Sequence, residues 1–485
     1  MVQLYGRNGS FGSLAPSKRL PSGQSFSTVP VSGWGFSTGH SAYMTAVTGS
    51  GCVVIGTTPY TDNQLQPTAS TMELGYLVPG TRRFNRVTVP STLGKATLSA
   101  PGSRYGGGDI GDVLVVGSGA RERVLFCSAA PYHGWNPRSE GLLPSFGALQ
   151  PTSSGGVTLD AAMSRTANQM AAGTNTMRMP LMDVGGGQTI ANSRGLNEMA
   201  QLPASGDIVI TQYFGPSMQN QQGGILVMDS SGRVKASWQY PAATFRGWSI
   251  KCLVREVDTD PTGVIGDERF VIICDAFYPS EQPAPFPAQE FSYNARTGTI
   301  RPVSVPFQAS GDGSRMETAK YGVDGSLFVA RTKTDGLSAA DVAVYRKGRL
   351  ALVAPAGPNW ATTAWSRVVA PDQFVSGTQG TGLVRSIALD PISGSILVTG
   401  LSGQLLASRG TAGRARVAAS LDLGLNNLVD RYTRNVGVRK GAVDAARRAL
   451  WLPVPQLSTA SYPSASYPNL DQWLYRVDLH QFVGI

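Results

Sequence analysis

The sequence predicts an all-β repeat fold, because one short phrase returns along the chain. The phrase is an apolar run introduced by a turn rich in Gly, Asp and Ser, and its centres lie 60, 95, 62, 56, 70 and 53 residues apart. Five of these six steps are near 60, and a fixed period indicates a repeat architecture. Continuous apolar runs between turns are typical of strands buried on both faces. We therefore predict a β-propeller with runs centred on Val54, Leu114, Val209, Val271, Leu327, Leu397 and Leu450.

Further strands surround the central run of each repeat. A short strand pattern precedes the run at Ser386–Asp390 and Gly441–Asp444, and a strand, turn and strand follow at Gly224–Val234. Strand, tight turn and strand is the signature of a β-hairpin. We expect a seven-bladed β-propeller of mostly four-stranded antiparallel blades, with six or eight blades as alternatives. The 95-residue step spans about two repeats of 40–50 residues, which leaves room for a degenerate eighth blade.

Two fragments carry a resemblance to known propellers. Gly322–Val329 and Ile387–Leu397 place a tight turn directly before the most apolar strand. In this respect they resemble the blades of NHL and PQQ-type propellers. The resemblance implies an architecture and no activity, since one scaffold hosts many unrelated functions.

The chain divides into an arm and a propeller. Residues 1–40 are rich in Ser, Gly and Pro and carry few strand signals, whereas residues 41–485 hold the repeats. The last repeat shows strands at Ala449–Pro453 and Trp473–Leu479, and little chain follows them. We expect a segment within Gln24–Ser37 to add a strand to this last blade and close the ring, because closure removes exposed sheet edges.

One long insertion, 131–187, is expected after the second blade. It accounts for the 95-residue step, and it contains the best helical stretch of the sequence, Leu159–Ala171. Asp160 suits the first turn of such a helix and Gly173 its end. Long loops on rigid scaffolds are usually functional, so we expect this insertion to contact a partner, the alternative being a cap packed on the propeller.

Composition excludes several classes of protein. The 485 residues carry a net charge of +10, yet only 15% are charged, and no run of five like charges or aromatic-basic motif suggests a nucleic-acid partner. No apolar stretch approaches 18 residues, so membrane insertion is not expected. The N-terminus, Met1–Arg7, lacks the pattern of a secretory signal peptide. A local excess of basic residues occurs at Arg414, Arg416, Arg431, Arg434, Arg439, Lys440, Arg447 and Arg448.

The search for metal and cofactor sites is negative. The three histidines, His40, His133 and His480, lie in unrelated contexts, and no metal-binding helix or phosphate-binding loop occurs. Asp258–Gly263 is interpreted as a turn rather than a cation site, because Asp, Pro and Gly form turns unaided. We predict no cofactor and no metal. The four cysteines, Cys52, Cys127, Cys252 and Cys274, lie in apolar runs, and the last two are placed to face each other across a hairpin.

No catalytic motif is evident. Ser310–Ser314 begins like the repeated box of sialidase-type propellers, but Arg315 and Met316 depart from it and no second copy exists. Glycoside hydrolysis requires two carboxylates in one cleft, and the sequence does not show which of its candidate acids lie together. We expect a protein that is not an enzyme. The candidate acids are Asp275, Glu290, Glu317 and Asp324.

Aromatic residues in loops are the candidates for binding. Tyr132, His133 and Trp135 open the expected insertion, and aromatic faces in loops stack on sugars and anchor protein interfaces. The alternative is that aromatic side chains pack between blades. The predicted binding residues are Tyr132, His133, Trp135, Trp34, Phe36 and Trp248.

Two classes of function remain. The weak charge, the turns rich in Gly, Ser and Thr, and the lack of catalytic motifs make the whole chain similar in style to minor tail proteins of phages that infect actinobacteria. That resemblance implies a virion protein of the tail tip, made in the host cytoplasm without a signal peptide. It also implies other tail or baseplate proteins as partners, host cell-wall glycan as a further ligand, and a role in assembly and attachment. The alternative is a propeller that binds a glycan or acts as a hydrolase or lactonase on a carbohydrate-like substrate.

Overall fold

The computed structural model confirms the all-β class. Within the described residues the protein is β-structure except for one 3-10 helix, η1 (Gly119–Arg121), and one short α-helix, α3 (Leu479–Val483). No helix in this part of the chain is long and apolar enough to cross a membrane. The described residues are 2–6, 27–28, 40–59, 73–81, 83–89, 109–129, 146–164, 182–183, 189–190, 193–214, 222–239, 252–276, 288–303, 314–333, 341–345, 365–369, 384–400, 404–409, 416–422, 440–456 and 471–483.

The described strands form consecutive antiparallel sheets, here numbered I to VII in chain order. Sheet I holds β3 (His40–Val47), β4 (Val53–Pro59), β5 (Leu74–Leu77) and β6 (Phe84–Val87). Sheet II holds β7 (Asp109–Val116), β8 (Arg123–Ala129), β9 (Phe146–Pro151) and β10 (Val157–Leu159). Sheet III holds β13 (Ser193–Gln201), β14 (Ile208–Phe214), β15 (Gln222–Met228) and β16 (Val234–Gln239).

The same order continues in the second half of the chain. Sheet IV holds β17 (Cys252–Thr259), β18 (Glu268–Ala276), β19 (Ala288–Asn294) and β20 (Thr299–Pro302). Sheet V holds β21 (Ser314–Tyr321), β22 (Leu327–Lys333), β23 (Asp341–Tyr345) and β24 (Trp365–Val369). Sheet VI holds β25 (Val384–Leu389), β26 (Ile396–Gly400), β27 (Gln404–Arg409) and β28 (Arg416–Asp422). Sheet VII begins with β29 (Ala442–Asp444), β30 (Ala449–Gln456) and β31 (Asp471–Asp478).

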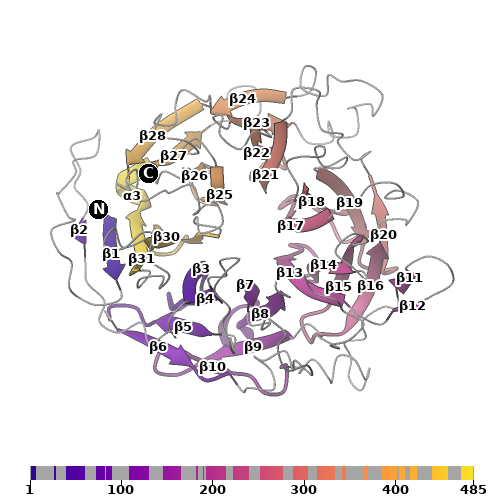
Figure 1. Cartoon of the computed structure of the whole chain (residues 1–485), viewed down its shortest axis with the longest axis horizontal. Helices are drawn as coiled ribbons and strands as arrows, with labels where there is room; N and C mark the ends of the chain where they lie inside the picture. Colours follow the sequence, from indigo (N-terminus) through magenta and orange to yellow (C-terminus); the bar gives the residue numbers. More distant parts are fainter. Residues whose placement is uncertain are drawn as a thin grey trace, which may run out of the picture.

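The first strands of the sheets surround a common centre (Figure 1). In the described residues β3 contacts β7, and the contacts continue through β13, β17, β21, β25 and β29 back to β3. Six of these strands, all except β29, shift register against the second strand of their sheet, which indicates a β-bulge. Radially arranged four-stranded antiparallel sheets are typical of β-propellers.

Apolar runs become the second strand in six of the seven sheets. In β14, for example, Ile208, Val209 and Ile210 are all fully buried, because the strand lies inside its sheet and between neighbouring sheets. The run around Leu114 is the exception, since it forms the first strand β7. The second strand is β8, in which Val124–Cys127 are fully buried.

The N-terminal strand joins the last sheet. β1 (Val2–Gly6) runs antiparallel to β31, with Val2 opposite Val477 and Gly6 opposite Trp473. β2 (Ser27–Thr28) lies parallel to β1 on its other side. The strand next to β31 is therefore Val2–Gly6 and not a part of Gln24–Ser37, which contributes only the outermost strand. The two ends of the chain meet in one sheet (Figure 1).

The segment 131–187 is not the single insertion that the sequence predicted. It contains β9 and β10, the two outer strands of sheet II, and β11 (Met182–Asp183), which pairs with β12 (Thr189–Ile190). The expected helix Leu159–Ala171 is also wrong where the structure describes it, because Leu159 ends β10 and Asp160–Ser164 form a turn. Asp160 accepts hydrogen bonds from the backbone of Ala162 and Met163, so its carboxylate caps that turn. Residues 165–171 lie outside the described residues.

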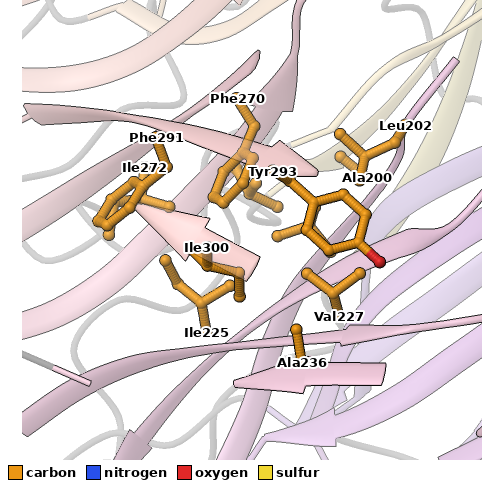
Figure 2. Packing of buried hydrophobic residues seen from close by; sticks show 12 residues of the cluster. Ala200, Leu202, Ile225, Val227, Ala236, Phe270, Ile272, Phe291, Tyr293 and Ile300 are labelled. Carbon is orange, nitrogen blue, oxygen red and sulfur yellow. The ribbon is translucent and has the colours of Figure 1, made fainter. Parts of the chain in front are cut away.

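Apolar side chains fill the spaces between neighbouring sheets. Figure 2 shows the cluster between sheets III and IV, where Phe270 and Phe291 stack with ring centroids 5.3 Å apart. Trp238 of sheet III meets Phe291 edge to face at 4.8 Å. Similar clusters join sheets I and II, II and III, and VII and I. These aromatic residues belong to the core and are not among the aromatic residues that the sequence selected for binding.

The cysteines behave as apolar residues where they are described. Cys52 and Cys127 are buried thiols, and burial raises the pKa of both. The strand register places Cys252 opposite Ala276 and Cys274 opposite Val254. Cys252 and Cys274 are thus offset by two residues, whereas the sequence had suggested that they face each other directly.

Candidate functional site

One end of the ring carries the hairpins that join first and second strands. Because strand direction alternates within a sheet, the hairpins between third and fourth strands lie at the same end. In sheet IV, Ala295 of the second kind of hairpin donates its N–H to the carbonyl of Ile265 in the first kind, at 3.0 Å. We call this end the hairpin face. Its first-to-second hairpins are 48–52, 117–122, 202–207, 260–267, 322–326, 390–395 and 444–449.

The Gly, Asp and Ser of the repeated phrase form these hairpins. Gly206, Gly325 and Gly394 have φ of 75°, 76° and 68°, the left-handed region that only glycine enters without strain. Asp390 accepts hydrogen bonds from the Ile392 N–H and the Ser393 hydroxyl, which fixes the turn. The phrase is thus a turn signal in sheets III, V and VI, whereas in sheet II its Gly111 and Asp112 lie inside β7.

The conformational role of these glycines predicts a modest, local effect. We expect Gly206→Ala to lower the free energy of unfolding by about 1–2 kcal/mol, because alanine is strained at this φ. Steric crowding contributes little, since the nearest atom to an added Cβ is Gln201 Nε2 at 3.8 Å. Gly266→Ala is the matched control, because its Cβ would meet nothing within 4 Å and its φ is not left-handed. Equal urea midpoints for the two variants would contradict this account.

Buried carboxylates lock neighbouring hairpins together. Glu122, at the start of sheet II's second strand, accepts the N–H of Gly49 from the hairpin of sheet I at 2.7 Å. Glu268 holds the same place in sheet IV and accepts the N–H groups of Ala204 and Ser205 at 2.9 and 3.0 Å. Both glutamates are buried. Charge-assisted bonds to backbone donors make the hairpins a rigid unit.

Arginines of sheet VII also connect its hairpin to the hairpins of the neighbouring sheets. Arg448 donates to the fully buried Asp390 of sheet VI at 2.5 Å, and Arg447 donates to the carbonyl of Ser50 in sheet I at 2.5 Å. Arg448 has φ of 49° at the position where other hairpins have glycine. An L-residue in this region is strained, and the ion pair with Asp390 offsets that strain.

A fully buried carboxylate lies nearer the centre of the ring. The Nζ of Lys440 is 2.6 and 2.7 Å from the two oxygens of Asp112 in β7. Asp112 also accepts the N–H of Met199 in sheet III at 2.8 Å, and the carbonyl of Lys440 accepts the N–H of Thr45 in sheet I at 3.0 Å. Burial raises the pKa of Asp112, and Lys440 opposes this rise. This contact ties four sheets together.

Polar groups are also buried between sheets IV and V. Asp258 accepts bonds from the Nζ of Lys320 and from the N–H of Tyr321, and the Tyr321 hydroxyl is 3.0 Å from the carboxylate of Glu290. Burial raises the pKa of Glu290, partly opposed by the Tyr321 hydrogen bond and by Arg269. The sequence predicted a turn at Asp258–Gly263. Asp260 accepts the N–H and hydroxyl of Thr262 in this turn, and Asp258 pairs with Lys320.

The raised pKa of Glu290 predicts a pH dependence of stability. Because its folded pKa lies above the unfolded value, the folded protein holds this proton more tightly than the unfolded chain. Its stabilising contribution is complete below the unfolded pKa and is lost as pH rises through the folded pKa. We expect the free energy of unfolding of Glu290→Gln, measured by urea titration, to change less than that of the unmodified protein between about pH 4 and pH 8. Asp324→Asn is the control, and an unchanged slope in Glu290→Gln would refute the assignment.

Exposed aliphatic residues lie on three neighbouring hairpins of this face. Val264 and Ile265 of sheet IV, Val323 of sheet V and Ile392 of sheet VI are 63%, 43%, 49% and 56% exposed. Val323 lies close to the hairpin of sheet VI, because a Cβ placed on Gly394 would be 3.4 Å from the Cγ2 of Val323. We call these four residues the aliphatic row.

The exposed charges of the hairpin face are mostly positive. The exposed carboxylates of its described hairpins are Asp267, which pairs with Arg269 at 2.7 Å, and Asp324, which accepts the Ser326 N–H at 3.0 Å. Both are engaged within their own hairpin or sheet. Basic residues are more numerous in and beside the described hairpins. They are Arg83, Arg121, Arg233, Arg296 and Arg447.

The residues that the sequence selected for binding stay a prediction, because the structure does not describe them. Tyr132, His133, Trp135, Trp34, Phe36 and Trp248 all lie outside the described residues. The sequence analysis did not select the aliphatic row. A signal for it existed, because Val and Ile lie there inside turns rich in Gly, Asp and Pro. Of the candidate acids, Glu290 is buried between sheets IV and V, and Asp324 caps an exposed turn. The side chains of Asp275 and Glu317 lie outside the described set.

Comparisons with known proteins add no family. No protein-family model and no curated protein sequence matches the chain. Solved structures that align with it include a chain of the COPII outer coat vertex on membranes (TM-score 0.48, 9% identity, 91% of this chain and 84% of that chain). Others are the C-terminal WD40 domain of Sif2 (0.40, 10%, 91% and 97%) and a putative 6-phosphogluconolactonase from Bacteroides uniformis (0.41, 13%, 79% and 85%). At these scores the likeness carries no argument about activity or partners.

Proposed function

We propose that the chain is a seven-bladed β-propeller in which sheets I to VII are the blades. Two observations support this proposal. Each repeat of the sequence phrase supplies one sheet, and the contacts between first strands lead from β3 around to β29 and back to β3. β1 and β2 then complete the last blade and join the two ends of the chain. Such a closed ring presents all its first-to-second hairpins on one rigid face.

The function that this geometry supports best is binding of a protein partner by the hairpin face. The observation that carries the proposal is the aliphatic row, which exposes four β-branched side chains on three neighbouring hairpins. Adjacent exposed apolar residues on a rigid scaffold are typical of protein interaction sites. The row offers aliphatic carbon and no polar side chain, which suits an apolar protein surface better than the hydroxyl groups of a glycan or carbohydrate-like substrate.

The setting that we propose is the tail tip of a phage, where other tail or baseplate proteins are the partners. This part of the proposal is supported by the resemblance of the sequence to minor tail proteins. If the chain is a virion protein, mass spectrometry of purified particles of the phage that encodes it will detect the chain, and tape-measure and baseplate genes will flank its gene. Absence from the particles would refute the setting and leave the binding face to be judged separately.

Photo-cross-linking tests the binding face. A benzophenone amino acid replaces Ile392 in the aliphatic row. As the control, it replaces the exposed Ser153, which lies on the same face but in a hairpin of sheet II, away from the row. In the cells that produce the protein, irradiation is expected to link the chain to one defined protein from position 392 and not from position 153. No adduct at 392, or the same adducts from both positions, would contradict a partner site at the row.

A further inference from the structure

A buried carboxylate lies between two of the three hairpins that carry the aliphatic row. Glu290, in β19 of sheet IV, is buried, and its Oε1 accepts the hydroxyl of Tyr321 at 3.0 Å. Tyr321 directly precedes the hairpin of Val323 in sheet V. The other carboxylate oxygen of Glu290, Oε2, lies 4.0 Å from Nη1 of Arg269 in β18. One carboxyl group thus faces residues of both sheets beside their hairpins.

Arg269 continues this connection to the hairpin of sheet IV. Its guanidinium donates to the two oxygens of Asp267 at 2.7 and 2.8 Å. The N–H of Asp267 in turn donates to the carbonyl of Val264 at 2.7 Å. The path of polar contacts from Val264 to the hairpin of sheet V therefore passes through the Glu290 carboxylate.

Glu290 is the group of this path whose protonation changes with pH. Arg269 holds the pKa of Asp267 below its usual value, so Asp267 stays ionised. Burial raises the pKa of the Tyr321 hydroxyl, which stays a donor, and burial also raises the pKa of Glu290. The other charged groups that face this path from the surrounding elements are Asp258, Asp260, Arg301 and Lys320.

We propose that Glu290 is a pH-sensitive bridge, which when ionised holds the hairpins of Val264 and Val323 in one arrangement and when protonated releases them. Protonation removes the attraction between the carboxylate and Arg269 and weakens the bond from Tyr321, which is then no longer charge-assisted. The two hairpins carry three of the four residues of the aliphatic row. Partner binding is therefore strongest at a pH above the folded pKa of Glu290, a consequence that rests on the proposed function.

Methyl resonances of isoleucine and valine, recorded by NMR on the full chain between about pH 4 and pH 8, test the bridge. We expect the methyl groups of Ile265 and Val323, one on each hairpin, to shift with one common midpoint. Both shifts are expected to disappear in Glu290→Gln. The matched control is Asp324→Asn, which removes the carboxylate next to Val323 and is expected to retain the common midpoint.

Two further variants separate the two contacts of Glu290. Arg269→Gln is expected to abolish the shift of Ile265 and to leave that of Val323, whereas Tyr321→Phe is expected to do the reverse. Different midpoints for the two methyl groups, a titration that persists in Glu290→Gln, or shifts that neither of these two variants changes would overturn the bridge.

Photo-cross-linking from position 392 tests the consequence for binding. In extracts of the producing cells irradiated at about pH 5 and about pH 8, we expect at least about fivefold more of the defined adduct at the higher pH. The yields are expected to be equal in Glu290→Gln. Equal yields in the chain with native Glu290 would overturn the regulation of the row by this residue. If no adduct forms at either pH, the proposed function is wrong, and the methyl titration still decides whether the bridge exists.

Discussion

Replacing Lys440 by Met is expected to lower the free energy of unfolding by about 3–5 kcal/mol. Lys440 donates to both oxygens of Asp112, whose side chain is fully buried. Without the ammonium group, Asp112 keeps only its bonds from the N–H groups of Val113 and Met199. A buried carboxylate without its counter-ion is strongly unfavourable, so the structure must either accept the charge or take up a proton. Urea unfolding followed by tryptophan fluorescence measures the loss.

A double-mutant cycle separates the ion pair from simple packing. Asp112→Asn alone should cost less than Lys440→Met, because the side chain of Lys440 is 31% exposed and can be hydrated. Combining Lys440→Met with Asp112→Asn should recover part of the loss, since no buried charge remains. Additive effects in the double variant would show that the pair is not coupled and would contradict the proposed role.

Removing residues 1–28 is expected to lower the free energy of unfolding by about 2.5–7.5 kcal/mol, if each of five paired residues contributes about 0.5–1.5 kcal/mol. The deletion takes away β1 and β2 and leaves β31 as an unpaired sheet edge. Exposed edges also promote association between molecules. We therefore expect a lower melting temperature in calorimetry together with increased light scattering.

A peptide that comprises residues 1–28 provides the control for this deletion. Added to the shortened protein, it should restore part of the melting temperature, whereas a scrambled peptide of the same composition should not. An unchanged melt after deletion would mean that the arm contributes nothing to closure, despite its pairing with β31.

The fold could be predicted because its signal is repeated and local. Apolar runs such as Ile208–Ile210 and Leu397–Val398 are continuous since their strands are covered on both faces, and the left-handed turns before them require Gly206 and Gly394. Where the pattern departs from this rule the prediction failed. The run at Leu114 is a first strand, partly exposed, so the repeat was placed on β7 instead of β8 and the following strands were mistaken for an insertion.

The candidate site could be predicted only in part. That Asp and Gly form turns is visible in the sequence, but the bonds of Glu122, Glu268 and Arg448 to neighbouring hairpins join residues 58 to 73 positions apart. Their pairing depends on how sheets stack, which no local pattern contains. The pair of Lys440 with Asp112 spans 328 residues for the same reason. The binding prediction was made for aromatic residues that lie outside the described residues, and the described surface adds the aliphatic row.

A single binding face exists only if the sheets close into one ring, and a cysteine pair tests this closure directly. Gln3 lies opposite Arg476 in the pairing of β1 with β31. In the variant with Gln3→Cys and Arg476→Cys, mild oxidation is expected to form a disulfide between the two ends of the chain, identified by peptide mass spectrometry. The control pair Gln3→Cys and Gln481→Cys, with its second cysteine at an exposed position of helix α3, should not form it. Failure of the first pair to cross-link, or equal cross-linking in both variants, would contradict the closed ring on which the account depends.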